Sequence, residues 1–475
     1  MATFKLNLSF NTQLHKQPLI NTSSPNKLYS RFPKTIRLSP VTCVASTTSK
    51  PISKTSSLHE KLSKKAGRDN SSCLLDQMDS LLRSELIRYG EMAQACYDAF
   101  ESNPYSKTFF QDLGMNDSGY MITSYIYSSN TSNLIPKFFT KTVHSDGPWN
   151  PMVNWMGYVA VSDDETTAQL GRRDITIAWR GTVTKLEWME DLMNFLKPVS
   201  AQNLISQDPS IKVMAGFLHI YTDKDQRCPY SKFSAREQLL AEVARLTKIY
   251  KQKGEEMSIT ITGHSLGSAL SILSAYDIAE SELDVLDDNI NKIPISVLSF
   301  SGPRVGNTRF RKRVEELGIK VLRVFNIHDR VPNVPGILFH EYTPAMIQRI
   351  ADWTTMFYSH IGQELALDHT RSSFVKKKLD MVSTHNLELL LHLIDGYHGK
   401  GGKFWLATGR DKALVNKHGD ILKHEYLIPP NWSQVENKGL RRNQNGEWML
   451  PEEESIEDHL RPEDVDRHLK NLGLV

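Results

Sequence analysis

Residues 258–267 read SITITGHSLG, a β-branched run that leads into the pattern G-x-S-x-G. A helical pattern of apolar residues then continues through Ile278. A strand, a tight turn and a helix in this order can present a serine on a strained turn, where glycines leave room for the crossing strand and helix. The alternative is an ordinary strand-to-helix turn, because the pattern constrains few positions. The flanking segments favour the strained turn, with Ser265 as a nucleophile.

Strand-like and helix-like segments alternate on both sides of this turn. A helix begins after Ser234, where Glu237 completes the pattern of a capping box. Helical pattern also starts near Leu75, whereas the polar and aromatic segment Asn103–Pro151 is expected to form irregular loops. The expected strands are Tyr158–Ser162, Ile175–Trp179, Ser258–Thr262, Ile295–Phe300 and Val321–Asn326. This order predicts a mainly parallel sheet with helices on both faces. Together with the G-x-S-x-G turn it indicates an α/β-hydrolase fold.

A serine nucleophile on this fold needs an acid and then a histidine later in the chain. Asp329 directly follows the expected strand Val321–Asn326, at the place where the acid would orient an imidazole and stabilise its charged form. The alternative is a surface turn in which Asp329 pairs with Arg330. We expect Asp329 to be the acid.

Several histidines follow Asp329, and their order alone does not separate them. His385 stands just before an apolar helical run, and a loop at the mouth of a helix suits a mobile imidazole. The candidates are His340, His360, His369, His385, His392 and His398.

Two backbone amides are expected to stabilise the oxyanion. The amide of Leu266 lies at the start of the helix after Ser265, where N–H groups are free of helical partners. The second would come from Thr182, in the polar turn after Ile175–Trp179. A plain strand-ending turn is the alternative for this second position.

The N-terminal region differs in charge from the remainder of the 475-residue chain. Residues 1–50 contain seven Lys or Arg and no Asp or Glu, so the net charge of +3 becomes 3 − 7 = −4 without them. This basic excess lies in a tail, which argues against a nucleic-acid-binding face. Its Ser- and Thr-rich composition predicts an organelle transit peptide, with a disordered terminus as the alternative. The stretch VTCVA at 41–45 resembles a chloroplast processing site with cleavage after Cys43, so we expect a chloroplast transit peptide over 1–43.

The remaining boundaries follow from composition. We expect a flexible linker over 44–75, a hydrolase domain over 76–440 and a charged, solvated C-terminal extension over 441–475. The four cysteines fit neither a zinc pattern nor a dense disulfide framework. No apolar run reaches the ~18 residues that span a bilayer, so any membrane contact is expected to be peripheral.

Several motifs together resemble the class 3 lipases: WRGT at 179–182, GHSLG at 263–267, SGPRVGN at 301–307 and DRVP at 329–332. YSHIG at 358–362, HNLE at 385–388 and DGYHG at 395–399 narrow the resemblance to the plant chloroplastic class I phospholipase A1 and galactolipase family. It extends from about Leu75 to about Trp432. Ser268 departs from it, because related lipases often have Gly or Ala there.

The resemblance implies a triad of Ser265, Asp329 and His385, with Thr182 and Leu266 as the oxyanion hole. It implies a plastid acyl hydrolase that releases fatty acid from the sn-1 position of phospholipids, galactolipids or both, and the fatty acid could feed oxylipin or jasmonate synthesis. It implies membrane glycerolipids as partners and neither a metal nor a cofactor. A lid would lie at 183–192, although a normal packed amphipathic helix is favoured there.

Two other functions stay open at this point. The first is a triacylglycerol lipase or general esterase on the same fold, because the residues do not reveal the head group. The second is a catalytically silent hydrolase fold that serves as a binding module. Silent relatives usually lack a triad member, whereas all three candidates are present here. No sequence feature identifies a protein partner.

Overall fold

A computed structural model describes residues 78–101, 110, 113, 115, 118–129, 153–182, 196–202, 204, 208–226, 231–287, 291–335, 357–432, 441–442, 448–449, 470 and 473–474. The expected transit peptide and linker lie outside these residues, as do the expected lid and most of the charged C-terminal extension. No helix among the described residues is long and apolar enough to cross a membrane.

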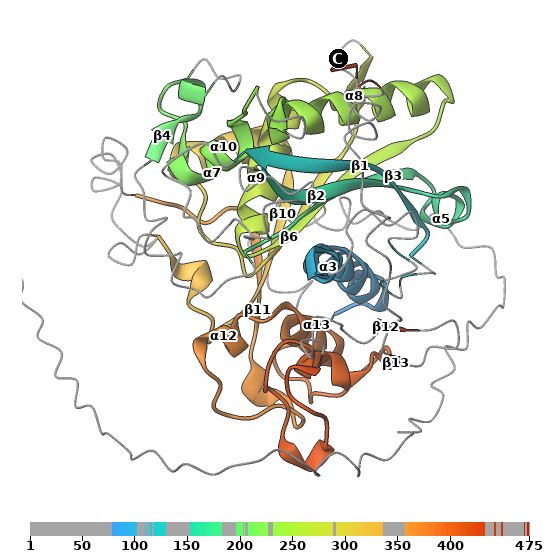
Figure 1. Cartoon of the computed structure of the whole chain (residues 1–475), viewed down its shortest axis with the longest axis vertical. Coiled ribbons are helices and arrows are strands. Elements are labelled where there is room, and N and C mark those ends of the chain that lie inside the picture. Colours follow the sequence, from blue (N-terminus) through green and yellow to red (C-terminus); the bar gives the residue numbers. More distant parts are fainter. Residues whose placement is uncertain are drawn as a thin grey trace, which may run out of the picture. The chain divides into compact units, whose positions relative to one another are not determined.

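A seven-stranded sheet lies at the centre of the described residues (Figure 1), in the order β1-β2-β3-β6-β9-β10-β11. Its strands are β1 (Tyr120–Ser129), β2 (Val153–Ser162), β3 (Arg173–Trp179), β6 (Met257–His264), β9 (Ile295–Phe300), β10 (Lys320–Asn326) and β11 (Gln363–Leu367). Within it, β2 pairs antiparallel with β1 and β3, and all other neighbours are parallel. The predicted mainly parallel sheet is confirmed.

Helices pack on both faces of this sheet (Figure 1), as predicted. One apolar cluster joins Ile177 of β3 to the helices α7, α8, α9 and α10, and the other joins Ala178 to α3 and α13. Adjacent strand residues point to opposite faces, so β3 contributes to both clusters. The α-helices are α3 (Ser80–Glu101), α5 (Asp164–Leu170), α7 (Ala215–Thr222), α8 (Ala235–Gln252), α9 (Leu266–Glu280), α10 (Thr308–Glu316), α12 (Met381–Thr384) and α13 (Leu387–Gly396).

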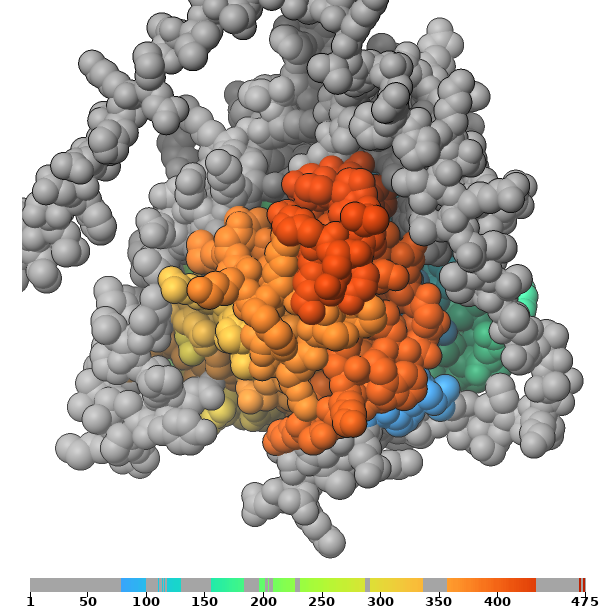
Figure 2. All heavy atoms as spheres, turned by 90° about the horizontal axis from the view of Figure 1, so that it is seen from below, coloured from blue at the N-terminus to red at the C-terminus, as the bar shows by residue number. Residues whose placement is uncertain are grey.

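Shorter elements connect these layers. Two-stranded ladders form between β4 (Leu196–Pro198) and β5 (Lys212–Met214), between β7 (Val285–Asp287) and β8 (Asn291–Lys292), and between β12 (Arg441–Arg442) and β13 (Trp448–Met449). The 3₁₀-helices are η2 (Val199–Gln202), η4 (Val331–Asn333), η5 (His369–Arg371), η6 (Lys412–Asn416) and η7 (His424–Tyr426). The segment 357–432 forms much of one surface of the molecule, in orange in Figure 2.

Local sequence patterns located the five inner strands of the sheet and the helices α3, α8 and α9. All five expected strands are present, and the capping box of Ser234 and Glu237 at α8 is confirmed. The expectation of irregular loops over Asn103–Pro151 was wrong for Tyr120–Ser129, which form β1. Its aromatic and β-branched residues become a strand by pairing antiparallel with β2. The sequence also gave no sign of β11, a short edge strand with an exposed Glu364.

Helix α3 lies along one face of the sheet. It extends from the end of the sheet where β3 begins to the end where β6 finishes. Near its middle, Tyr89 donates to the buried carboxylate of Asp174 at the start of β3 (2.8 Å). Towards its end, Tyr97 meets His264, the last residue of β6. Active sites of open parallel sheets lie at the carboxyl ends of the strands, so α3 carries Tyr97 to that edge.

Candidate active site

Ser265 occupies the turn between β6 and α9, in a backbone conformation that a serine rarely adopts (φ 58°, ψ −124°). Its flanking glycines are required by close packing. A Cβ at Gly263 would lie 2.4 Å from the Gly267 backbone, and one at Gly267 would lie 2.3 Å from the Trp179 carbonyl oxygen. The G-x-S-x-G pattern therefore folds into the strained turn that the sequence predicts, and a residue larger than glycine at either site must displace backbone.

The departure at Ser268 has a structural role in this turn. Its hydroxyl lies 2.5 Å from the carbonyl oxygen of Gly263 and 3.0 Å from that of Phe300, the last residue of β9. The amide of Ser265 donates to the same Phe300 carbonyl (2.9 Å). The hydroxyl of Ser268 therefore ties the start of α9 to the ends of two neighbouring strands.

Asp329 and His385 are brought together from separate parts of the chain. Asp329 follows the end of β10, and His385 stands between α12 and α13. Their buried side chains meet at 2.7 Å, from His385 Nδ1 to Asp329 Oδ2. The amide of Val331 donates to the other carboxylate oxygen (2.9 Å). An ionised carboxylate accepts only, so Nδ1 carries the hydrogen and Nε2 of a neutral ring is left as an acceptor.

Each of the other described candidate histidines is engaged elsewhere. His360 contacts Arg323, and His369 contacts Asn326. His392 contacts the Ser372 hydroxyl (2.9 Å), and His398 donates to the Trp405 carbonyl while its ring stacks on that indole. His340 lies outside the described residues. Among the described candidates, His385 is the histidine that contacts Asp329.

Two of these engaged histidines make the stability of the fold depend on pH. Burial lowers the pKa of His360 to about 2 and that of His392 to about 3, with nearby arginines acting in the same direction. An unfolded histidine titrates near pH 6.5, so below that value the unfolded chain binds more protons than the folded one. Stability is therefore full above about pH 6.5 and is lost as the pH falls towards the folded pKa values.

We expect His392 to account for about 2 kcal/mol of the unfolding free energy lost between pH 7 and pH 5. Urea unfolding of wild type and His392→Gln at both pH values measures this. The variant should show a pH-dependent loss smaller by about that amount, whatever its stability at pH 7. Equal losses in the two proteins would contradict the assignment.

The atoms expected to react are both buried and free of hydrogen bonds. Ser265 Oγ and His385 Nε2 have no hydrogen-bond partner among the described residues, and no hydrogen bond joins them to each other. The rings of His264 and His385 lie 4.6 Å apart, which brings the histidine against the turn that holds Ser265. A free hydroxyl and a free imidazole acceptor thus lie at the same edge of the sheet.

The backbone around Thr182 is held by a buried arginine. Arg180 donates to the carbonyl oxygens of Trp155 (2.9 Å) and Gly181 (3.1 Å). The N–H and C=O of a trans peptide point in opposite directions, so holding the Gly181 carbonyl also sets the direction of the Thr182 N–H. A Cβ at Gly181 would lie 2.6 Å from the His264 carbonyl oxygen, which shows how closely this turn packs on the one with Ser265.

A chain of hydrogen bonds that the sequence did not reveal joins these parts. His264 Nε2 contacts the backbone carbonyl of His385 (2.8 Å), and its Nδ1 contacts the Tyr97 hydroxyl (2.7 Å). A carbonyl only accepts, so His264 donates from Nε2 and its neutral ring accepts from Tyr97. Burial, reinforced by His385, holds the pKa of His264 well below its usual range and keeps this ring neutral. The Tyr97 hydroxyl also packs against Gly181, where a Cβ would lie 2.0 Å from it.

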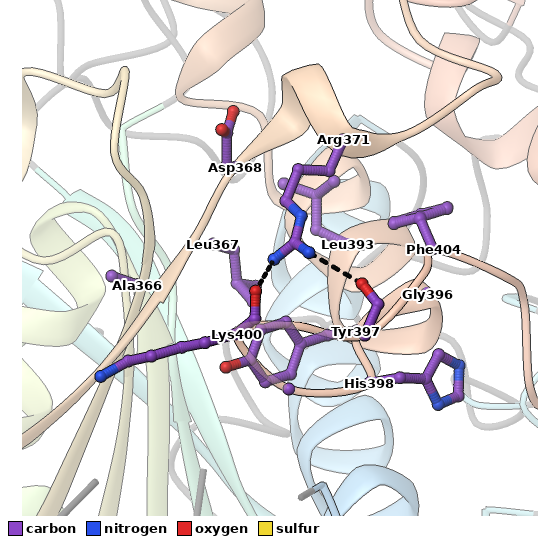
Figure 3. A pocket seen from close by; sticks show the side chains of 12 residues that line it. Ala366, Leu367, Asp368, Arg371, Leu393, Gly396, Tyr397, His398, Lys400 and Phe404 are labelled. Atoms are coloured by element: carbon purple, nitrogen blue, oxygen red, sulfur yellow. Dashed lines mark hydrogen bonds between the residues drawn. The ribbon is translucent and has the colours of Figure 1, made fainter. Parts of the chain in front are cut away.

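A separate cavity of about 110 Å³ lies beside the end of β11 (Figure 3). Arg371 crosses one side of it and donates to the carbonyl oxygens of Lys400 and Gly402. Its lining includes Tyr397 and His398 of the DGYHG motif, and none of Ser265, Asp329 and His385. Ligand pockets usually occupy about 300–1,000 Å³, so this cavity is too small for a lipid chain.

One described group has the chemistry of a metal site. His328, Asp368 and His369 each place a ligand atom within 4.8 Å of the others. His328 Nε2 and Asp368 Oδ1 already bond each other (3.1 Å), and Asp368 Oδ1 also accepts from the amide and the hydroxyl of Thr370. These contacts complete the loop after β11 without an ion, and we assign no metal to them.

Comparison with known proteins places this geometry in a family. The class 3 lipase family matches residues 176–339. The chain is 54% identical over 420 residues to Phospholipase A1-Igamma2, chloroplastic, of Arabidopsis thaliana, covering 86% of this chain and 79% of the relative. It is 51% identical over 410 residues to Phospholipase A1-Igamma1, chloroplastic (84% and 79% covered), and 50% over 441 residues to Phospholipase A1-Igamma3, chloroplastic (88% and 82%), both of Arabidopsis thaliana.

Proposed function

Because this chain belongs to the plant chloroplastic phospholipase A1 family of the class 3 lipases, we propose that Ser265, Asp329 and His385 release fatty acid from the sn-1 position of membrane glycerolipids. The protein is a carboxylic ester hydrolase of the chloroplast. The observation that carries the proposed site is the 2.7 Å contact between His385 and Asp329, which leaves His385 Nε2 free at the edge of the sheet that holds Ser265.

In the first step, His385 Nε2 removes the proton of Ser265 as Oγ attacks the sn-1 ester carbonyl carbon. The new oxyanion accepts from the amides of Thr182 and Leu266, each of which contributes about 2.7–4 kcal/mol. When the bond to the glycerol oxygen breaks, His385 returns the proton to that oxygen and the lysolipid leaves. Asp329 stabilises the charged imidazole throughout.

In the second step, water replaces the glycerol oxygen. His385 takes a proton from water, the hydroxide attacks the acyl carbon, and the bond to Ser265 Oγ breaks. The proton passes to Ser265, so the free enzyme returns and the fatty acid is released.

The substrate is a membrane lipid, so we propose that the protein contacts the membrane peripherally. We further propose that the polyunsaturated fatty acids released in this reaction supply oxylipin or jasmonate synthesis.

Fatty-acid release by the full chain tests this function. The substrates are phosphatidylcholine, monogalactosyl and digalactosyl diacylglycerol, and triacylglycerol, each with different acids at sn-1 and sn-2. We expect the sn-1 acid and a 2-acyl lysolipid from one or more polar lipids. Release from triacylglycerol alone would replace the proposal with a neutral lipase, and release of the sn-2 acid would contradict the proposed position of attack.

The hydrogen bond of Tyr97 to His264 predicts a positioning role in this reaction. In Tyr97→Phe, His264 loses the donor to its Nδ1, so the ring that donates to the backbone carbonyl of His385 is held less firmly. We expect kcat to fall about tenfold to hundredfold, with KM changed less than about twofold.

Tyr158→Phe is the matched control, because this buried tyrosine also makes a hydrogen bond to α3, through the Met92 carbonyl (2.9 Å). Each variant should lose about 1 kcal/mol of unfolding free energy. If kcat falls equally in both, the effect is one of stability and Tyr97 has no positioning role.

A further inference from the structure

Exposed apolar side chains gather on the two loops that carry Asp329 and His385. Ile327, Met381 and Val382 are 51%, 40% and 54% exposed. They are three of the seven large apolar side chains that are exposed among the described residues, although the two loops are short. Single exposed apolar residues are ordinary, whereas a group of them at one place indicates contact with an apolar partner.

Contacts between the loops bring these side chains to the same place. Ile327 lies between Asn326 and Asp329 in the chain, and both of these residues contact the segment after Val382. Asn326 Nδ2 donates to the Thr384 carbonyl (3.3 Å), and Asp329 meets His385 at 2.7 Å. Ile327 and Val382 therefore lie on two loops that meet at the proposed catalytic pair.

The backbone of both loops is held, so the exposure is built into the fold. The amide of Ile327 donates to the Leu367 carbonyl at the end of β11 (2.8 Å). Helix α12, which holds Met381 and Val382, is capped by Asp380, whose carboxylate accepts from the Ser383 amide (2.7 Å). Both loops present apolar side chains to solvent from a fixed frame.

Basic residues flank this apolar group. Arg330 is exposed directly after Asp329, and Lys377 is exposed close to His369. His369 lies against His328, next to Asp329 (ring centroids 4.6 Å apart). The Lys377 ammonium itself reaches the Thr370 carbonyl. The acids nearby are Asp368, which bonds His328, and Asp380, which caps α12.

We propose that Ile327, Met381 and Val382, flanked by Arg330 and Lys377, form a rim patch by which the protein rests on a bilayer that contains anionic lipid. The apolar side chains enter the level of the lipid head groups and the basic ones meet the lipid phosphates. The inference rests on the proposed function, because it places Ser265 and His385 over the lipid that they act on.

Vesicle binding tests the rim patch separately from hydrolysis. All proteins carry Ser265→Ala, so lipid is not consumed, and all retain residues 1–50, so the basic tail binds equally in each. Cosedimentation with vesicles of equal parts phosphatidylcholine and phosphatidylglycerol gives the partition coefficient. For Ile327→Ser/Val382→Ser we expect it to fall about tenfold or more. Met381→Ser alone should lower it about threefold, and serves if the double variant does not fold.

Leu81→Ser/Met121→Ser is the matched control, because these side chains are 48% and 56% exposed and lie at the opposite end of the sheet. Met121 is near the start of β1, which runs in the same direction as β3, so it lies away from the carboxyl ends of the parallel strands. Leu81 lies at the end of α3 away from Tyr97. The control should bind like its parent. Equal binding by the rim and control variants, or no binding by the parent, would overturn the rim patch.

The basic residues have their own test. Arg330→Gln/Lys377→Gln should weaken binding to the anionic vesicles by about fivefold for each charge removed, and leave binding to pure phosphatidylcholine unchanged. Lys248→Gln/Lys253→Gln is the matched control. It removes the same charge at the C-terminal end of α8, shortly before β6 begins. An equal loss in both would show a dependence on net charge and contradict a basic rim. If the wild type hydrolyses no ester while these binding differences hold, the proposed function fails and the rim patch stands.

Discussion

Ser265→Ala should lower kcat for fatty-acid release by about 10⁴- to 10⁶-fold, with little change in KM. The variant keeps the strained turn, since its backbone and flanking glycines are unchanged, but it has no oxygen to form the acyl-enzyme. Residual turnover would come from the oxyanion amides and from substrate binding alone. Steady-state kinetics on a lipid that the wild type cleaves measures both constants.

Ser301→Ala is the control for this prediction. Ser301 follows β9, is buried, has a positive φ (48°) and has no hydrogen-bond partner for its hydroxyl among the described residues. It therefore shares the strain and the free hydroxyl of Ser265, but it does not begin a helix and has no imidazole assigned to it. We expect its kcat to stay within about threefold of wild type. If Ser301→Ala were inactive and Ser265→Ala active, the nucleophile would be Ser301.

Asp329→Asn should lower kcat about 10⁴-fold. The asparagine amide can donate to Nδ1 of His385, and the hydrogen of a neutral ring then moves to Nε2, which can no longer accept the Ser265 proton. It also lacks the charge that stabilises the imidazolium. KM should change little, because Asp329 is buried and separated from the lipid by His385.

Asp368→Asn is the matched control for the acid. It removes a carboxylate from the neighbouring loop, where Asp368 bonds His328 rather than His385. Its kcat should remain within a few-fold of wild type. A loss of less than about tenfold in Asp329→Asn would contradict the proposed triad, since His385 would then need no carboxylate.

Local patterns in the sequence predicted the turn at Ser265 and the strands that lead to it. The reason is physical: β-branched residues before the turn, glycines inside it and a helical run after it are all set by neighbours in the chain. The parallel sheet followed from the alternation of such units. The position of Asp329 after β10 followed as well, because the carboxyl ends of parallel strands share one edge.

Contacts between distant segments could not be predicted in this way. The sequence left six candidate histidines after Asp329, and the fold distinguishes His385 from the other described candidates by its contact with a residue 56 positions earlier. Tyr97 lies 167 positions before His264, in a helix whose pattern shows an apolar face and nothing of its partner. The partners of Asp174 could not be predicted either, because they lie in four elements, α3, β1, β3 and β6. Its five hydroxyl donors are Tyr89, Tyr120, Thr176, Ser258 and Thr260.

The most direct test of the proposed mechanism is to identify the residue that carries the covalent intermediate. A fluorophosphonate reacts with an activated serine and leaves a stable adduct, which peptide mass spectrometry can locate in the full chain. The proposed mechanism predicts one adduct, on Ser265, that forms in step with the loss of fatty-acid release and is greatly slowed in His385→Ala. An adduct on another serine, or complete inhibition with Ser265 unmodified, would contradict it.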